Sequence, residues 1–386
     1  MRIGFDVSQT GSGKAGCGYY AHALIKALLE LESGHSFSLY PSFGDYYFDP
    51  RMPLSCPYEG HQVQYGPRHL TRESAAVFWN APRLEDALDH PDVVHSNNFW
   101  APMGLQSTRL IYTLYDLAFM VEPAWTTEEN RIGCFDGVFR ASIAADWIVA
   151  ISDASKDDFL RHFPHFPSER IRVIYPCSRF VDGAILGRRP GLLENVEAER
   201  FWLSVGTIEP RKNHHRLAEA YARYLAKGGE TMPLVFAGGM GWLMEDFARE
   251  LSALGITDQV VMTGYVSDEE LIWLYRNCYA NLYPSLFEGF GLPVLEGMQF
   301  GAATISSDST SLPEVTGKAG VLLPPHDIEA WAEEMHTLGS DRARRQHLRG
   351  LGQERAAHFD WKRSAHRLLE LYEEAASSSK LTGTVR

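Results

Sequence analysis

The chain has few cysteines, and their spacing excludes several kinds of protein. Its 386 residues include five, at scattered positions: Cys17, Cys56, Cys134, Cys177 and Cys278. An odd number without a Cys-x-x-Cys pair is not typical of a disulfide framework, a zinc site or a redox pair. We therefore expect a reduced protein of the cytoplasm.

Long apolar runs and excess positive charge are also missing. The opening segment MRIGFDVSQTG is unlike a signal peptide, and no run of about 18 apolar residues predicts a membrane span. Lys and Arg number 36 against 49 Asp and Glu, a net charge of −13. This balance argues against nucleic acid or anionic lipid as general partners, although a small basic pocket can still bind a phosphate.

Strand-like apolar runs alternate with helical patterns, which predicts βα units and parallel sheets. The length favours two domains. We expect an α/β protein of two Rossmann-like domains facing across a cleft, with domains at 1–185 and 201–360 and a linker at 186–200. In 361–386 we expect a helix that crosses back to the first domain, followed by a mobile tail. The predicted strands are Arg2–Val7, Val93–His95, Leu110–Leu114, Trp147–Ile151 and Ile171–Tyr175, then Phe201–Val205, Leu234–Ala237, Val260–Thr263, Ala280–Tyr283 and Thr304–Ser306.

The segment 285–301, SLFEGFGLPVLEGMQFG, follows one of these strands and predicts an anion site. Gly289 and Gly291 allow the backbone to approach a ligand, and Pro293 suits the first turn of a helix whose N–H groups point at an anion. Glu288 precedes the turn and Glu296 lies in the helix. An acidic residue here either complements the helix dipole or accepts hydrogen bonds from ligand hydroxyls.

The segment 206–213, GTIEPRKN, follows the first strand of the second domain. It places Arg211 and Lys212 at the carboxyl edge of the sheet, where open α/β sheets bind ligands. There the pair can neutralise a diphosphate. The alternative is a pair of solvated surface cations.

Five segments in this order resemble the group-1 family of retaining glycosyltransferases, which has the GT-B architecture. They are GTIEPRKN, FAGGMGW (236–242), GYVSDEELIWLY (264–275), YPSLFEGFGLPVLEGM (283–298) and TSLPEV (310–315). In the first half, GCGYYAHAL and DWIVAISDASKDDF are also similar to the family. The similarity is greatest to the bacterial mannosyltransferases that elongate surface polysaccharides such as O-antigen.

The resemblance implies a nucleotide-sugar donor, with a GDP-sugar favoured, and a saccharide or lipid-linked saccharide acceptor. We expect the second domain to bind the donor and the first to bind the acceptor. Arg211 and Lys212 would hold the diphosphate, Glu288 would lie near the transferred sugar, and Glu296 would bind the ribose. The remaining donor contacts that it implies are Gly206, Gly264, Tyr265, Val266, Gly289, Phe290, Gly291 and Leu292 in the second domain, and Gly16 and Gly18 in the first. A lipid-linked acceptor implies transient contact with the inner face of the membrane.

The expected chemistry is metal-independent transfer with retained configuration and no other cofactor. No Asp-x-Asp pair, the usual ligand of a nucleotide-bound metal, occurs in the chain. Preorganised cations would stabilise the leaving diphosphate. The sequence leaves open a front-face departure and a short-lived covalent intermediate.

One position departs from the family pattern. Members commonly have His-Asp where this chain has Tyr115 and Asp116. Tyr115 either affects the choice of donor sugar at its C6 end or is a packed core aromatic.

Other functions remain as alternatives. GSGKAG (11–16) matches the glycine pattern of a nicotinamide dehydrogenase, but no acidic residue clearly ends the next strand. A sugar phosphorylase, a nucleotide-sugar epimerase and a binding protein without turnover can share the architecture.

Overall fold

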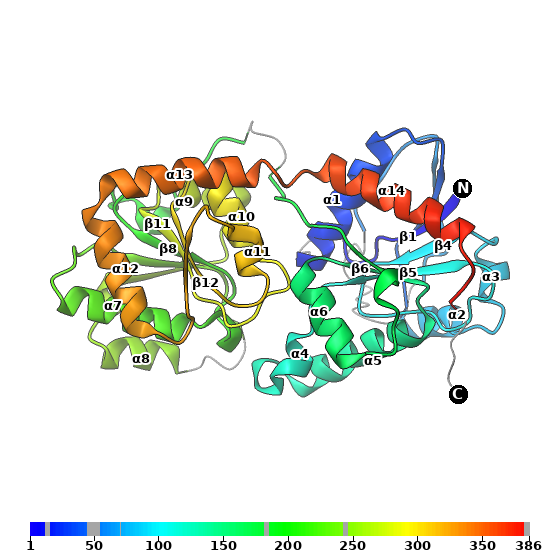
Figure 1. The fold of residues 1–386 in the computed structure, drawn as a ribbon, viewed down its shortest axis with the longest axis horizontal. Coiled ribbons are helices and arrows are strands. Elements are labelled where there is room, and N and C mark those ends of the chain that lie inside the picture. The colour runs from blue at the N-terminus through cyan, green and yellow to red at the C-terminus, as the bar shows by residue number, and fades with distance from the viewer. Residues whose placement is uncertain (12–15, 45–54, 70, 181–184, 242–245, 382–386) are drawn as a thin grey trace. The chain divides into compact units, whose positions relative to one another are not determined.

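The computed structural model describes residues 1–11, 16–44, 55–69, 71–180, 185–241 and 246–381. The chain forms two compact units, Met1–Arg179 with Asp360–Arg386, and Phe180–Phe359. In each unit, helices cover a parallel sheet (Figure 1). The glycine pattern at 11–16 lies largely outside the described residues.

The sheet of the first unit has the strand order of a Rossmann fold. Seven parallel strands are described, in the order β3-β2-β1-β4-β5-β6-β7. Their bounds are β1 Arg2–Asp6, β2 Ser36–Tyr40, β3 Val63–Tyr65, β4 Val93–Ser96, β5 Arg109–Leu114, β6 Trp147–Ala150 and β7 Ile171–Val173. The order reverses between β1 and β4, which creates a switch point where the loops after these two strands diverge.

Several helices of this unit begin at recognisable N-caps. The side chains of Thr71, Thr127 and Ser152 each accept a hydrogen bond from a backbone N–H in the first helical turn. The bounds are α1 Gly16–Glu30, α2 Arg72–Trp79, α3 Leu84–Ala87, α4 Ala118–Val121, α5 Glu128–Ala144, α6 Asp153–His162 and α14 Trp361–Ser377. α14 packs against α1, so the chain ends in the same unit in which it began (Figure 1).

The second unit repeats the same topology with six described strands, in the order β10-β9-β8-β11-β12-β13. Their bounds are β8 Trp202–Val205, β9 Leu234–Ala237, β10 Val260–Gly264, β11 Ala280–Tyr283, β12 Thr304–Ser307 and β13 Val321–Leu323. The helices are α7 His214–Ala226, α8 Phe247–Ala253, α9 Asp268–Asn277, α10 Leu292–Gln299, α11 Leu312–Thr316, α12 Ile328–Ser340 and α13 Arg342–Ala356. The switch point lies between β8 and β11.

The strands predicted from sequence are present within one or two residues, whereas β2, β3 and β13 were not predicted. β3 and β13 are three-residue strands without a fully buried residue, so they lack a strong apolar signal. The segment 186–200, expected to be a linker, contributes Leu193 to the core of the second unit beside Phe180 and Phe201.

The described residues after α14 make hydrogen bonds to the first unit, whereas the mobility expected of the tail stays a prediction. The Leu381 N–H donates to Asp146 at 2.7 Å, and Lys380 Nζ donates to the Thr108 carbonyl at 2.9 Å. Asp146 is fully buried at the start of β6. A buried carboxylate requires donors, and the sequence pattern of the tail does not reveal that it supplies one.

Glycines bring the loops after β8, β9 and β10 into close contact at the carboxyl edge of the second sheet. The Gly238 N–H donates to the Gly264 carbonyl at 3.0 Å. A Cβ atom on Gly238 would lie 2.0 Å from the carbonyl oxygen of Gly206, which is backbone and cannot rotate away. The approach of these loops therefore depends on the missing side chain.

We predict that Gly238→Ala destabilises the second unit by about 2–3 kcal/mol, because the new methyl group overlaps a backbone carbonyl. Gly239→Ala is the matched control: its Cβ would meet nothing within 4 Å. Its effect should stay within about 0.5 kcal/mol. Urea unfolding followed by tryptophan fluorescence measures both. Equal effects of the two substitutions would contradict the close approach.

Candidate functional site

Two loops meet at the switch point of the second sheet. One follows β8 and carries Arg211 and Lys212, and the other follows β11 and carries Glu288. Their backbones are joined by the Leu286 N–H, which donates to the Arg211 carbonyl at 2.9 Å. Because β8 and β11 are neighbours in a parallel sheet, their carboxyl ends bring these loops together.

Asn213 fixes the end of the first loop. It adopts a left-handed conformation (φ 62°), which Asn tolerates better than most residues, and α7 begins at the next residue. Its side-chain amide donates to the carbonyls of Pro284 (3.0 Å) and Pro325 (2.7 Å). Asn213 therefore holds the loop after β8 against the loops after β11 and β13.

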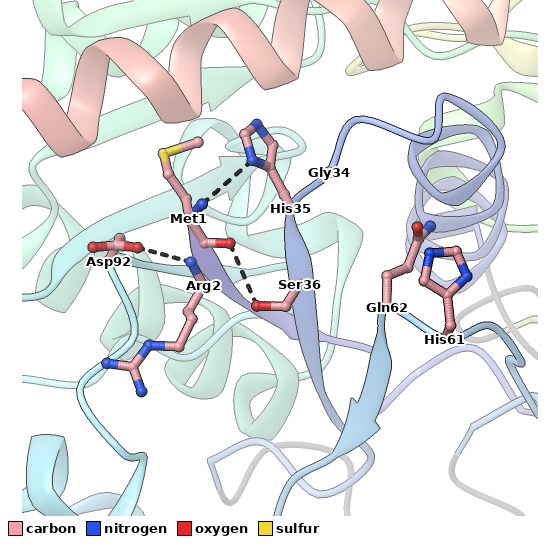
Figure 2. Close-up of a pocket in the computed structure, with 8 residues that line it drawn as sticks. All are labelled: Met1, Arg2, Gly34, His35, Ser36, His61, Gln62 and Asp92. Carbon is pink, nitrogen blue, oxygen red and sulfur yellow. Dashed lines mark hydrogen bonds between the residues drawn. The ribbon is translucent and has the colours of Figure 1, made fainter.

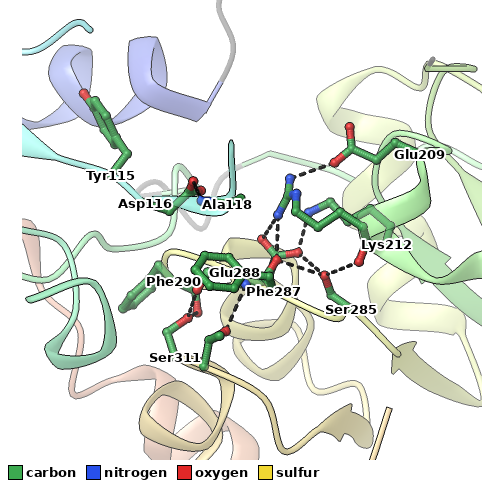
Figure 3. Close-up of polar contacts among 12 residues, drawn as sticks. Tyr115, Asp116, Ala118, Glu209, Lys212, Ser285, Phe287, Glu288, Phe290 and Ser311 are labelled. Carbon is green, nitrogen blue, oxygen red and sulfur yellow. Dashed lines mark hydrogen bonds and ion pairs between the residues drawn. The ribbon is translucent and has the colours of Figure 1, made fainter. Parts of the chain in front are cut away.

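The carboxylate of Glu288 is the centre of the site. Its Oε1 accepts hydrogen bonds from Lys212 Nζ (2.6 Å), Ser285 Oγ (2.6 Å) and the Tyr283 hydroxyl (2.9 Å). Its Oε2 accepts one from Arg211 Nη1 at 3.0 Å. Figure 3 shows the carboxylate between Lys212 and Ser285. Glu288 is only 7% exposed, so both cations bind a carboxylate that is largely withdrawn from water.

Arg211 has further partners that fix the plane of its guanidinium. Nη1 also donates to the Phe287 carbonyl at 2.8 Å, and Nη2 donates to Glu209 at 2.7 Å (Figure 3). Glu209 is itself buried. Arg211 thus lies between two carboxylates, which excludes the alternative of a solvated surface cation.

The charges of the site determine its protonation. Burial alone would raise the pKa of Glu288, but the charges of Lys212 and Arg211, with hydrogen bonds from Lys212 and Ser285, lower it from 4.5 to about 2. Burial lowers the pKa of the neighbouring His214 to about 3, and the Lys212 charge adds to this shift. At neutral pH Glu288 is therefore ionised and His214 is neutral.

The glycine-rich turn after Glu288 has the predicted form. Gly291 adopts φ 107° as the N-cap of α10, and Pro293 lies in the first turn of this helix. A Cβ on Gly291 would lie 2.5 Å from Leu312 Cδ2. Ser311 Oγ donates to the carbonyls of Glu288 and Phe290, at 2.9 Å each (Figure 3). The turn is therefore held from α11 as well as from α10.

Glu296 lies in α10, as expected, and occupies its second turn. Its side chain is buried, and the Tyr275 hydroxyl donates to its Oε2 at 3.3 Å. Leu292 begins the helix, and Gly289 lies in the turn before it. Ribose binding by Glu296 stays a prediction.

Four of the other expected donor contacts, Gly206, Gly264, Tyr265 and Val266, lie in the loops after β8 and β10 or at their starts, along the same edge of the sheet. Gly206 (φ 147°) follows β8, and Gly264 (φ 65°) ends β10. Both conformations favour glycine. Tyr265 is 83% exposed, and Val266 is partly buried in the core beside β8 and α9.

The predicted site residues of the first unit lie at its own carboxyl edge. Tyr115 is buried, and its hydroxyl donates to the carbonyls of Asn97 (2.9 Å) and Cys17 (3.3 Å). These are the contacts of a packed aromatic side chain; its role in sugar choice stays a prediction. The carboxylate of Asp116 accepts a hydrogen bond from the Ala118 N–H at 3.0 Å.

Gly16 and Gly18 do not lie in a loop before α1. They form its first turn, and Gly18 is buried. A Cβ on Gly16 would meet nothing within 4 Å. Their part in donor binding stays a prediction.

Sequence reasoning missed several residues that hold the site. Glu209 and Ser285 contact the charged groups directly, and Thr310 Oγ1 accepts a hydrogen bond from the Glu288 N–H at 2.9 Å. All three occur within the segments quoted above, but no role was assigned to them. The sequence shows that these residues occur in the same segments as Arg211 and Glu288 or in a neighbouring quoted segment. It does not show where their side chains point, because that depends on how the loops fold.

Elsewhere in the first unit, a hollow of about 390 Å³ lies at the amino ends of the strands, lined in part by Arg2, Ser36 and Asp92 (Figure 2). Parallel strands place it at the edge opposite the switch point. In the described part of the chain, no three His, Cys, Asp or Glu side chains gather as a metal site. No helix in that part is long and apolar enough to cross a membrane.

We predict that the contribution of Glu288 to stability depends on pH. Its pKa in the folded protein, about 2, lies below its ordinary value of 4.5. This contribution, of about 3 kcal/mol, is therefore present above pH 4.5 and is lost as the pH falls toward 2. Glu288→Gln should lower the melting temperature most at pH 7 and less at pH 4. If the difference in melting temperature between the unchanged protein and Glu288→Gln does not narrow from pH 7 to pH 4, the ion pairs of Glu288 do not contribute as predicted.

Both parts of the chain match known families of glycosyltransferases. Residues 193–355 match the family model "Glycosyl transferases group 1", and residues 15–177 match "Glycosyltransferase Family 4". The chain is 30% identical over 294 residues to the O-antigen chain mannosyltransferase B of Escherichia coli, which covers 75% of each protein. It is 37% identical over 186 residues to an E. coli serotype-specific mannosyltransferase WbdA, over 48% of this chain and 23% of the relative.

Solved structures share the fold. Anabaena HepE in complex with UDP and glucose has a TM-score of 0.68 at 18% identity and covers 97% of this chain and 100% of that one. Sucrose-phosphate synthase from Thermosynechococcus elongatus has a TM-score of 0.70 at 20% identity and covers 98% and 100%. Together with the two parallel sheets, these matches show that the chain has the GT-B fold and belongs to the group 1 family of glycosyltransferases.

Proposed function

We propose that this glycosyltransferase moves a mannosyl residue, or a related hexosyl residue, from a GDP-sugar to a saccharide or lipid-linked saccharide acceptor in surface-polysaccharide synthesis. The observation that carries the proposal is the convergence of Arg211 and Lys212 on Glu288 at the switch point of the second sheet. The names of the E. coli relatives support mannose and O-antigen. We further propose a cytoplasmic reaction, with transient membrane contact when the acceptor is lipid-linked.

The two cations suit the leaving group of this reaction. Cleavage of the anomeric bond leaves negative charge on the diphosphate. Arg211 and Lys212 are positively charged, and ion pairs with Glu288 hold them in place. Preorganised cations in a poorly hydrated site stabilise such charge at little reorganisation cost. In our proposal, the diphosphate takes over part of the coordination that Glu288 now provides.

Glu288 suits an electrostatic role better than a nucleophilic one. It stays ionised at neutral pH, so it can stabilise positive charge that develops on the sugar. However, its Oε1 already accepts three hydrogen bonds and its Oε2 accepts one from Arg211. Lone pairs used in this way are poor nucleophiles. This favours a front-face departure with retained configuration over a covalent intermediate on Glu288.

In the proposed mechanism the acceptor proton passes to an oxygen of the leaving diphosphate. Arg211 and Lys212 hold that diphosphate, and no divalent metal takes part. These two residues therefore supply the charge that a metal supplies in other transferases. Metal independence is tested below.

We predict that GDP raises the melting temperature of the purified protein more than UDP, ADP, TDP or NAD, with or without EDTA. A ligand that binds only the native state stabilises it by about 2.7 kcal/mol at a hundredfold excess over Kd. Arg211→Ala should abolish the shift. Arg223→Ala is the control, because Arg223 is also an ion-paired arginine of this unit but lies exposed on α7 beside Glu329.

The outcomes separate the alternatives. Stabilisation by UDP alone would retain the transferase and replace the base, and stabilisation by NAD alone would indicate a dehydrogenase. GDP-mannose and an oligosaccharide acceptor should then yield a product whose anomeric configuration is read by NMR. Conversion of the donor without an acceptor would indicate an epimerase, and consumption of inorganic phosphate a phosphorylase.

A further inference from the structure

A chain of buried polar side chains crosses the first unit from α14 to its switch point. The Tyr372 hydroxyl on α14 lies 2.6 Å from His95 Nδ1 on β4, and His95 Nε2 lies 2.9 Å from Thr113 Oγ1 on β5. Thr113 Oγ1 lies 2.8 Å from Asn97 Oδ1, in the loop after β4. The four groups come from segments as far as 277 residues apart.

In this series of hydrogen bonds, each proton has one possible position. Asn97 Nδ2 donates to the Asp6 carbonyl at 3.2 Å, so Asn97 Oδ1 is the atom that faces Thr113 and must accept. Thr113 has only one hydroxyl proton, so it must accept from His95 Nε2–H. Burial lowers the pKa of His95 to about 3, so the ring is neutral, and its Nδ1 accepts from Tyr372. Donation therefore runs in one direction, from α14 to Asn97.

Asn97 connects this chain to the groups at the switch point. Its N–H donates to Asp6 Oδ2 at 3.0 Å, and the Ser8 N–H donates to Asp6 Oδ1 at 2.9 Å. Its carbonyl accepts from the Tyr115 hydroxyl at 2.9 Å. The loops after β1, β4 and β5 thus meet at one asparagine, which the side chains behind it hold in place.

Burial makes the chain sensitive to the loss of any member. His95, Thr113 and Tyr372 are fully buried, and Asn97 is nearly so. A buried donor or acceptor that loses its partner cannot turn to water, so its neighbours must reorganise. Removal of the Tyr372 hydroxyl therefore disturbs the position of Asn97 through His95 and Thr113.

We propose that Tyr372, His95 and Thr113 are positioning residues, which fix Asn97 and through it the edge of the first sheet that carries Tyr115. The role rests on the proposed function and on the expectation that the first domain binds the saccharide acceptor, which we place at this edge. The packing of α14 on the first unit then determines the geometry of that edge. In this proposal α14 acts through Tyr372 and does not contact the substrate.

Amide hydrogen exchange of the protein without substrate tests the connection directly. Tyr372→Phe and Thr113→Val each remove one hydroxyl and keep the size of the side chain. Each should speed exchange at the Asn97 and Ser8 amides about tenfold. Thr113→Ser restores the hydroxyl and should return both rates to those of the unchanged protein.

The control is Tyr221→Phe in the second unit. Tyr221 is also fully buried, and its hydroxyl donates to the Met232 carbonyl at 2.8 Å. This variant loses the same kind of hydrogen bond and should leave exchange at Asn97 and Ser8 unchanged. Equal acceleration in Tyr221→Phe and Tyr372→Phe would overturn the proposal, because a general loss of stability would then explain both.

Turnover distinguishes positioning from a purely structural role. With GDP-mannose and an oligosaccharide acceptor, Tyr372→Phe and Thr113→Val should raise the acceptor KM about tenfold and leave the thermal shift by GDP unchanged. Faster exchange with an unchanged acceptor KM would overturn the positioning role while transfer itself stands. Absence of any transfer would overturn the proposed function, and hydrogen exchange would still decide whether the chain fixes Asn97.

Discussion

The buried charge of Glu288 constrains the whole site of the second unit. Withdrawal of a carboxylate from water is costly unless cations and hydrogen-bond donors surround it, and removal of one partner leaves an uncompensated charge. Here Arg211 and Lys212 come from one loop and Ser285 from another, so both loops must adopt one conformation to satisfy a single side chain. Glycines support these loops in two ways: Gly238 lets backbone approach the Gly206 carbonyl, and Gly206 and Gly291 adopt positive φ angles that favour glycine.

The two units use one topology for different kinds of interaction. In the second unit, charged side chains gather where the loops after β8 and β11 meet. In the first unit, the corresponding position between β1 and β4 is held by hydrogen bonds among mostly neutral groups around Asn97. An ionic arrangement responds to an anionic ligand by exchanging partners. A neutral one has little to exchange and keeps its geometry, which suits a surface that recognises hydroxyl groups by direction.

Much of the second site could be predicted because its signals are local. A strand, a glycine turn and Pro293 occur in sequence, and Arg211 and Lys212 lie in one βα loop, so their edge of the sheet follows from topology. Their pairing with Glu288 could not be predicted, because it depends on which loops are neighbours. The same limit is stronger for His95 and Tyr372, which are joined across most of the chain. No periodicity records such a contact, and an isolated histidine at the end of a strand has no visible partner in the sequence.

The residues after α14 affect how the protein can be engineered. Leu381 donates its amide to Asp146, and Arg109 donates to the Ser378 carbonyl at 2.7 Å. A deletion of residues 378–381 would therefore remove two partners of the buried Asp146, which directly precedes β6, rather than trim a dispensable extension. Purification handles and fluorescent fusions belong beyond Leu381, separated from it by a flexible spacer. A circular permutant that joins the N- and C-termini of the chain must keep these four residues in their present positions.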